Sequence, residues 1–124
     1  MERTLLKSKI HRGRVTDADL EYEGSLTLDP EFMRGADLVP YEQVHVVNLN
    51  NGARFVTYVI EGQPGTKAIC LNGAAARLGQ VGDQVIIMSY TRIQETDARH
   101  HQPTVVLLND NNEILSVTSN SVTV

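Results

Sequence analysis

A chain of 124 residues, 41% of them hydrophobic and 21% charged, has the size and composition of one ordinary globular domain. The net charge of −4 gives no general affinity for nucleic acid or for a membrane surface. No apolar N-terminal segment and no run of about 18 apolar residues is present, so we expect neither a signal peptide nor a membrane span and assign the protein to the cytoplasm. Cys70 is the single cysteine and lies in an apolar run, which predicts a small buried thiol rather than a reactive one.

Short runs rich in Val, Ile, Thr and Leu, separated by turn residues, predict a mainly β domain spanning residues 1–124. The expected strands are Thr4–Ile10, Arg14–Leu20, Ser25–Leu28, Val44–Asn48, Arg54–Ile60, Lys67–Leu71, Gln84–Tyr90, Thr104–Leu108 and Ile114–Val122. Two short helices are expected among them. One begins at Pro30 after the N-cap Asp29 and ends near Gly35, and the other spans Gly73–Leu78.

Basic side chains concentrate at the N-terminus of this acidic chain. Lys7, Lys9 and His11 are two residues apart, so on a strand they share one face, while Ser8 and Ile10 take the other. Two interpretations stay open at this point: an edge strand whose lysines prevent aggregation, or a binding site for an anionic ligand.

The adjacent pair His100–His101 is the other feature that invites a functional reading. Neighbouring residues rarely point at one ion, and no acid or cysteine completes a ligand set with them. We therefore expect a surface loop there and predict no metal site.

The dipeptide Gly24–Ser25 is, taken alone, a common turn sequence. Its context is more specific and consists of the segments Lys9–Arg12, Leu20–Ser25, Asn51–Tyr58, Leu71–Arg77 and Gly82–Asp83. In their order and spacing, from about residue 1 to residue 115, these segments resemble the bacterial aspartate 1-decarboxylase family. The resemblance implies a small six-stranded double-psi β-barrel with short helices.

The resemblance also implies an inactive precursor that cleaves its own Gly24–Ser25 bond. The products would be a β chain of residues 1–24 and an α chain of residues 25–124 that begins with a pyruvoyl group made from Ser25. The Ser25 hydroxyl would attack the Gly24 carbonyl, and Thr57 would stabilise the carbonyl oxygen. Glycine suits position 24 because it tolerates backbone conformations that other residues resist.

The implied cofactor is this pyruvoyl group, with no metal. It would act as the electron sink by forming a Schiff base with L-aspartate. The implied products are CO2 and β-alanine, the latter for pantothenate biosynthesis. Arg54 and Lys9 match the cations that bind substrate, and a guanidinium suits bidentate recognition of a carboxylate. Thr57 also matches a substrate-binding position, and Tyr58 matches the proton donor. Thr57 and Tyr58 are adjacent on an alternating strand, so a bulge or a strand end would be needed for both to reach one site.

The segment after the expected strand Lys67–Leu71 matches the family's substrate-contacting turn, in which small residues expose backbone N–H groups at a helix start. The matching positions are Asn72, Gly73, Ala74 and Ala75.

The implied assembly is a homotetramer of processed protomers, four α and four β chains, with active sites between neighbours. The sequence does not decide whether an accessory maturation protein is needed for the cut. Two alternatives stay open. One is a β-barrel binding module whose basic strand contacts nucleic acid, which the acidic charge and scarce aromatics disfavour. The other is a family member that folds without cleaving itself and acts only as a partner of active copies.

Overall fold

The computed structural model describes residues 1–119. Its strands are β1 (Glu2–Arg14), β2 (Asp17–Asp19), β3 (Ser25–Leu28), β4 (Gln43–Asn48), β5 (Arg54–Glu61), β6 (Ile69–Asn72), β7 (Gln84–Gln94), β8 (Thr104–Leu108) and β9 (Ile114–Thr118). The helical segments are α1 (Pro30–Gly35), the 3-10 helix η1 (Gly73–Arg77) and α2 (Glu95–Ala98). The predicted mainly β class with short helices is confirmed, whereas the count of six strands is not, because this part of the chain forms nine.

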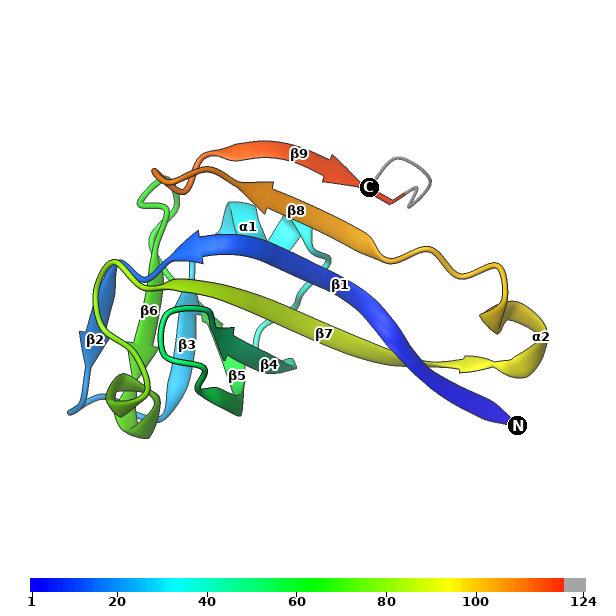
Figure 1. Ribbon diagram of the computed structural model, residues 1–124, viewed down its shortest axis with the longest axis horizontal. Helices are drawn as coiled ribbons and strands as arrows, with labels where there is room; N and C mark the ends of the chain where they lie inside the picture. The colour runs from blue at the N-terminus through cyan, green and yellow to red at the C-terminus, as the bar shows by residue number, and fades with distance from the viewer. Residues whose placement is uncertain (120–124) are drawn as a thin grey trace.

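The nine strands are hydrogen-bonded in the order β2-β6-β3-β5-β4-β7-β1-β8-β9. Three pairs, β1–β8, β2–β6 and β3–β5, are parallel, and the others are antiparallel. The long strands β1 and β7 form an antiparallel ribbon across the molecule, and β2, β6 and β3 stand together at one end (Figure 1). No helix in residues 1–119 is long and apolar enough to cross a membrane.

The core is aliphatic and is built by the period-2 alternation of the strands. Leu26 and Leu28 of β3 and Ile69 and Leu71 of β6 are fully buried on one face of their pair. Phe32 of α1 completes this part of the core. The opposite face of β3 and β6 is therefore left to the alternate, polar residues.

The start of α1 agrees with the sequence prediction because its determinants are local. The Asp29 carboxylate accepts a hydrogen bond from the backbone N–H of Glu31 at 2.9 Å, and Pro30 occupies the first helical position. The predicted helix Gly73–Leu78 is instead a 3-10 helix that ends at Arg77. The four-residue α2 was not predicted. Its N-cap residue makes no side-chain cap hydrogen bond, so a capping residue was not available as a sequence signal.

Strand lengths differ from the prediction where distant segments pair. β1 continues past Ile10 because Gly13 and Arg14 pair with β7. The predicted strand Arg14–Leu20 is divided, since the chain leaves β1 at Arg14 and pairs with β6 only over Asp17–Asp19. In β9 the described strand ends at Thr118, and the predicted positions 120–122 lie outside the described residues.

A β-bulge at Lys7 changes the predicted basic face of β1. The Lys7 ammonium donates to the Glu42 carboxylate at 2.8 Å, and the same carboxylate accepts from the Ser89 hydroxyl at 2.6 Å. Ser89 is buried opposite Ser8, so Lys7 turns toward the side that Ser8 occupies. The prediction that Lys7 shares a face with Lys9 is therefore wrong, because the extra residue interrupts the alternation.

Candidate active site

Four polar residues lie together on the face of β3 and β6 that is turned away from the aliphatic core. The antiparallel register places Ser25 opposite Asn72 and Thr27 opposite Cys70. Since residues two apart on a strand share a face, the four side chains form one group, called here the polar square. It joins two segments that are more than forty residues apart in the chain.

The Asn72 side-chain amide connects the polar square by hydrogen bonds. Its Nδ2 donates to Ser25 Oγ at 3.0 Å and to Thr27 Oγ1 at 2.8 Å, while its Oδ1 accepts from Cys70 Sγ at 3.0 Å. The Ser25 hydroxyl in turn donates to the backbone carbonyl of Glu23 at 3.0 Å. Ser25 and Asn72 are 1% and 2% exposed, so these bonds hold the Ser25 hydroxyl without competition from bulk water.

Gly24 lies just outside this buried group and is exposed. A Cβ built on it would meet nothing within 4 Å, and its φ is not positive. The expectation that position 24 uses the conformational freedom of glycine therefore finds no support in the backbone.

Gly73, by contrast, has a structural need for glycine. Its φ is +63°, and a Cβ there would lie 2.7 Å from both Cα and N of Gly24 and 2.9 Å from the Tyr22 carbonyl oxygen. The backbone of η1 thus runs directly against the Gly24 backbone. Only a residue without a side chain allows that approach.

Two pockets flank the Gly24–Ser25 bond. The first, the Gly24 pocket, has a volume of about 340 Å³ and is lined by Gly24, Phe55, Val56, Thr57, Tyr58, Ala74, Ala75 and Leu78. The second, the Ser25 pocket, has a volume of about 400 Å³ and is lined by Tyr22, Glu23, Ser25, Pro40, Tyr41, Tyr58, Ile60 and Glu61. Tyr58 lines both pockets and is the residue that they share.

The positions of Thr57 and Tyr58 answer the question that strand alternation raised. β5 pairs with β4 in continuous register from Arg54 to Tyr58, so no bulge turns either residue. β3 pairs with β5 from Leu26, opposite Val59, and the preceding Gly24–Ser25 segment therefore meets the edge of β5 beside Thr57 and Tyr58. The strand end that is needed belongs to β3, which begins at Ser25, and Thr57 and Tyr58 both line the pocket beside it.

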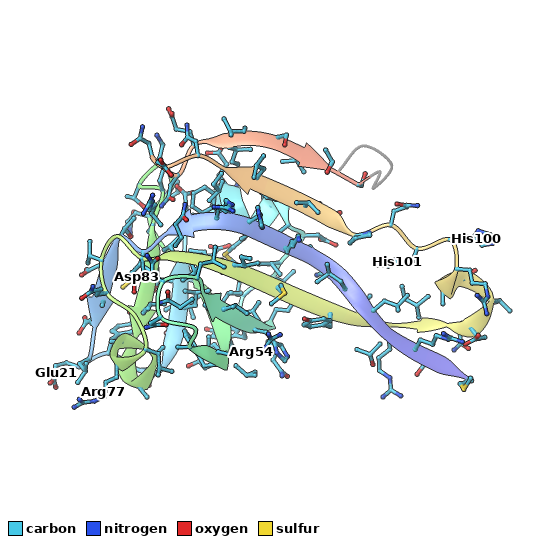
Figure 2. All side chains as sticks on the ribbon, in the orientation of Figure 1. Glu21, Arg54, Arg77, Asp83, His100 and His101 are labelled. Atoms are coloured by element: carbon cyan, nitrogen blue, oxygen red, sulfur yellow. The ribbon has the colours of Figure 1, made fainter. Side chains whose placement is uncertain are left out.

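The predicted cations Arg54 and Lys9 lie at different distances from the bond. Arg54 begins β5, is exposed, and directly precedes the residues that line the Gly24 pocket (Figure 2). Lys9 lies on β1 and lines neither pocket. It pairs with Met88, which pairs with His45, which pairs with Val56. Three strand spacings, roughly 14 Å, thus separate Lys9 from β5.

Neither cation is neutralised within residues 1–119: the side chains of Lys9 and Arg54 form no hydrogen bond or ion pair there. By comparison, Lys7 is bonded to Glu42, and Arg3 to Glu95 at 2.5 Å. The two free cations are thus available to an anionic ligand, but one chain does not bring both to the Gly24 pocket.

Two histidines lie on or against β1 and differ in their hydrogen bonds. His11 has a buried Nδ1 with no partner in the described part of the chain. Burial first, and then the charges of Lys9 and Arg12, lower the pKa of His11, which favours the neutral ring. His101 hydrogen-bonds the Leu6 carbonyl through Nε2 at 2.6 Å and lies at the end of the molecule near α2 (Figure 2). No group of three or more His, Cys, Asp or Glu residues suited to a metal ion occurs among residues 1–119.

Sequence reasoning missed Cys70 and Thr27 as members of the site. Cys70 is half-buried rather than buried, and burial, followed by Asp17 and Asp19, raises the pKa of its thiol to about 11. The alternation of polar and apolar residues in Ser25–Leu28 and Ile69–Asn72 was the available signal. It could not be used without knowing that these two segments pair.

Comparison with known proteins shows which family the sequence matches. The family model described as aspartate decarboxylase matches residues 1–115. A protein of Dehalococcoides mccartyi is 58% identical over 113 residues, with 91% of each chain covered. One of Syntrophobacter fumaroxidans is 56% identical over 116 residues, with 94% of each covered, and one of Staphylococcus aureus is 50% identical over 117 residues, with 94% of this chain and 92% of the relative covered. All three are named aspartate 1-decarboxylase. The solved structure of the computationally designed msDPBB_sym2 protein is similar with a TM-score of 0.44 and 17% identity, covering 70% of this chain and 99% of that one.

Proposed function

The chain belongs to the aspartate decarboxylase family, and on that premise we propose that it is a carbon–carbon lyase that decarboxylates L-aspartate to β-alanine. In this proposal the chain first cuts itself between Gly24 and Ser25. The β chain is then residues 1–24, and the α chain, residues 25–124, carries a pyruvoyl group in place of Ser25. The β-alanine would serve pantothenate biosynthesis. The observation that carries the proposal is the buried, hydrogen-bonded Ser25 hydroxyl next to an exposed Gly24 with a pocket on either side.

The residues around Ser25 fit a group of this kind. Ser25 is the first residue of β3 and stays attached to the sheet through its pairing with Asn72. Gly24 lies outside the strand and is exposed, so the preceding segment can separate after a cut. The pyruvoyl group supplies the electron sink for amino-acid decarboxylation, which no standard side chain provides.

The proposed cut requires only groups of this chain and one water molecule. Ser25 Oγ attacks the Gly24 carbonyl carbon, its proton passes to the amide nitrogen, the C–N bond breaks, and Gly24 becomes an ester on Oγ. Loss of the Ser25 Cα proton then expels the Gly24 carboxylate. Water displaces the nitrogen as ammonia and leaves the keto group. Thr57 lines the pocket on the Gly24 side, where charge develops on the carbonyl oxygen, and Asn72 already donates to Oγ, the oxygen that departs.

In aspartate turnover, Tyr58 is the proposed proton donor to the substrate α-carbon, and its place among the lining residues of both pockets supports this role. Ala74 and Ala75 give the Gly24 pocket a wall with little bulk. Asn72 and Gly73 are engaged with Ser25 and Gly24 in the intact chain. We propose that they contact substrate only once the cut has released those partners.

Substrate carboxylates are the proposed ligands of Arg54 and Lys9. Arg54 lies at the end of the strand that lines the Gly24 pocket. For Lys9 the distance across three strands favours a role in the site of a neighbouring protomer. We therefore propose a homotetramer of processed protomers, acting in the cytoplasm, with active sites between neighbours.

A time course of the purified chain tests the proposal. Denaturing electrophoresis and mass measurement should show two fragments that meet at residues 24 and 25, with the larger one blocked at its N-terminus, together with β-alanine formation from L-aspartate. Ser25→Ala should stay whole. An intact chain after prolonged incubation, both alone and with cell extract, contradicts self-cleavage and favours a family member that only partners active copies. Cleavage that begins only on addition of cell extract identifies an accessory maturation protein.

A further inference from the structure

We propose that Cys70 is a positioning residue for the cut at Gly24–Ser25: its thiol donates to Asn72 Oδ1 and so directs Asn72 Nδ2 toward the Ser25 hydroxyl. The inference rests on the proposed self-cleavage and extends it to a residue that does not touch the reacting bond. Cys70 acts through Asn72, its neighbour in the polar square.

The placement of Cys70 follows from the sheet. Cys70 and Asn72 are two apart on β6, so their side chains share the face that carries Ser25 and Thr27 on β3. Asn72 lies between the thiol on one side and the two hydroxyls on the other. Leu26 and Leu71, which alternate with these polar residues, are buried in the core. Their packing fixes the two strands and so keeps the four polar side chains together.

The count of donors and acceptors shows why the thiol matters. Asn72 offers two N–H donors and one oxygen acceptor, and all three are used: both N–H groups go to hydroxyl oxygens, and the oxygen receives the thiol. If the amide were flipped, its NH2 would face a sulfur, which is a weak acceptor. The flipped oxygen would face the Ser25 hydroxyl, whose hydrogen is already given to the Glu23 carbonyl, and could accept only from the Thr27 hydroxyl. The flipped amide would thus lose two N–H···O bonds, and a donor at position 70 adds to the preference for nitrogen toward Ser25.

The protonation state of the thiol is consistent with this role. Burial, with added repulsion from Asp17 and Asp19, raises the pKa of Cys70 to about 11. At neutral pH the sulfur keeps its hydrogen and can donate. A thiolate at the same place would repel the Asn72 oxygen and favour the flipped amide.

The orientation has a chemical consequence at Ser25. With Nδ2 directed at Oγ, Asn72 holds the nucleophile in one position before attack. It also donates to the oxygen that gains negative charge when the Gly24 carboxylate leaves. Without a donor at position 70 the Asn72 oxygen loses its partner, the amide is held only by its two N–H bonds, and cleavage slows although the backbone pairing of β3 and β6 is unchanged.

A pair of substitutions separates positioning from packing. Cys70→Ser keeps a donor, and Cys70→Val fills a similar volume on a strand without one. We expect the serine variant to release the two fragments at close to the wild-type rate and the valine variant to be slower on the order of tenfold, the worth of one buried hydrogen bond. Melting temperatures of both substitutions in a Ser25→Ala background, which stays uncut, should agree and so exclude a loss of fold. If the valine variant precipitates, Cys70→Ala provides the donor-free comparison.

Each result decides the inference. A valine variant that cleaves as fast as wild type overturns it, because no donor is then needed. A serine variant as slow as the valine variant also overturns it, because the sulfur would then act by its size. A wild-type chain that never cleaves overturns the proposed self-cleavage and this inference together, whereas the first two results leave self-cleavage intact.

Discussion

The region around the Gly24–Ser25 bond and the basic part of β1 differ in how complete they are within one chain. Around the bond, Ser25, Asn72 and Gly73 are buried and in direct contact with their partners. On β1, Lys9 faces no acid in the described residues and lies about three strand spacings, roughly 14 Å, from the β5 edge. The first region has its parts assembled by folding alone, and the second has a charge without a ligand.

This difference separates two reactions that the proposed function requires. A cut that uses only groups of the first region can proceed within one chain. In the proposed turnover of aspartate the substrate binds to cations, and Lys9 is supplied by a neighbouring protomer. The comparison therefore predicts that changes near Gly73 affect folding and the cut, while changes at Arg54 or Lys9 affect turnover and leave the cut alone.

The largest expected effect is that of Gly73→Ala. A Cβ at this positive φ would overlap the Gly24 backbone, so we expect the free energy of unfolding to fall by about 3 kcal/mol and the cut to be lost. The matched control is Gly24→Ala, where a Cβ meets open space and stability should change by less than about 0.5 kcal/mol. Urea unfolding of both in a Ser25→Ala background measures this. Equal stability of the two alanine variants would show that the backbone of Gly73 in η1 does not pack against the backbone of Gly24.

Arg54→Ala should cleave normally and then lose aspartate turnover by about a hundredfold, as expected for removal of a charge-assisted, bidentate contact to a carboxylate. Steady-state β-alanine formation per processed chain measures the loss. Arg34→Ala, which removes another exposed arginine, on α1, serves as the control and should be unaffected. Normal turnover in Arg54→Ala would contradict the carboxylate assignment.

Lys9→Ala should reduce turnover by about tenfold, because one charge-assisted contact is lost. The sharper measurement mixes chains. The Ser25→Ala chain has Lys9 but cannot form the cofactor, whereas the Lys9→Ala chain forms the cofactor but lacks the lysine. If the active site lies between protomers, a mixed assembly contains complete sites. Co-expression of the two chains should therefore give more turnover than the two separate preparations combined. An activity no greater than that sum would place Lys9 and the cofactor in the same chain and would contradict an active site shared between protomers.

The smallest expected effect concerns Glu42, which holds Lys7 at the bulge. Burial raises the pKa of this carboxyl, but hydrogen bonds from Lys7, Ser89 and the Val39 backbone outweigh burial and leave the pKa below its ordinary value. A depressed pKa in the folded state adds stability above the ordinary value, and that stability is lost as the pH falls below it. Glu42→Gln should therefore cost about 1 kcal/mol at pH 7 and flatten the acid limb of the stability curve.

Denaturant unfolding between about pH 3 and pH 7 checks the Glu42 prediction, with Glu31→Gln on the exposed surface of α1 as control. An acid limb equally steep in Glu42→Gln and wild type would mean that the bulge does not depend on this carboxylate.

Local chemistry in the sequence determined the elements whose causes lie within a few residues. The ends of β3, the start of α1 at Asp29–Pro30 and the strand Thr104–Leu108 agree with the prediction, because alternation, a cap and turn residues specify them. The segments of family resemblance likewise predicted roles for the Gly24–Ser25 bond, Thr57 and Tyr58 before any contact was known.

Only the tertiary structure decided the contacts that depend on register between distant strands. The pairing of β3 with β6 places Cys70 and Asn72 against Ser25, and the bulge in β1 turns Lys7 away from Lys9. Propensity and spacing say which residues share a face of one strand, but the partner across the sheet is chosen by core packing of the whole chain. For that reason the sequence indicated which bond to examine, and the fold showed which side chains hold it.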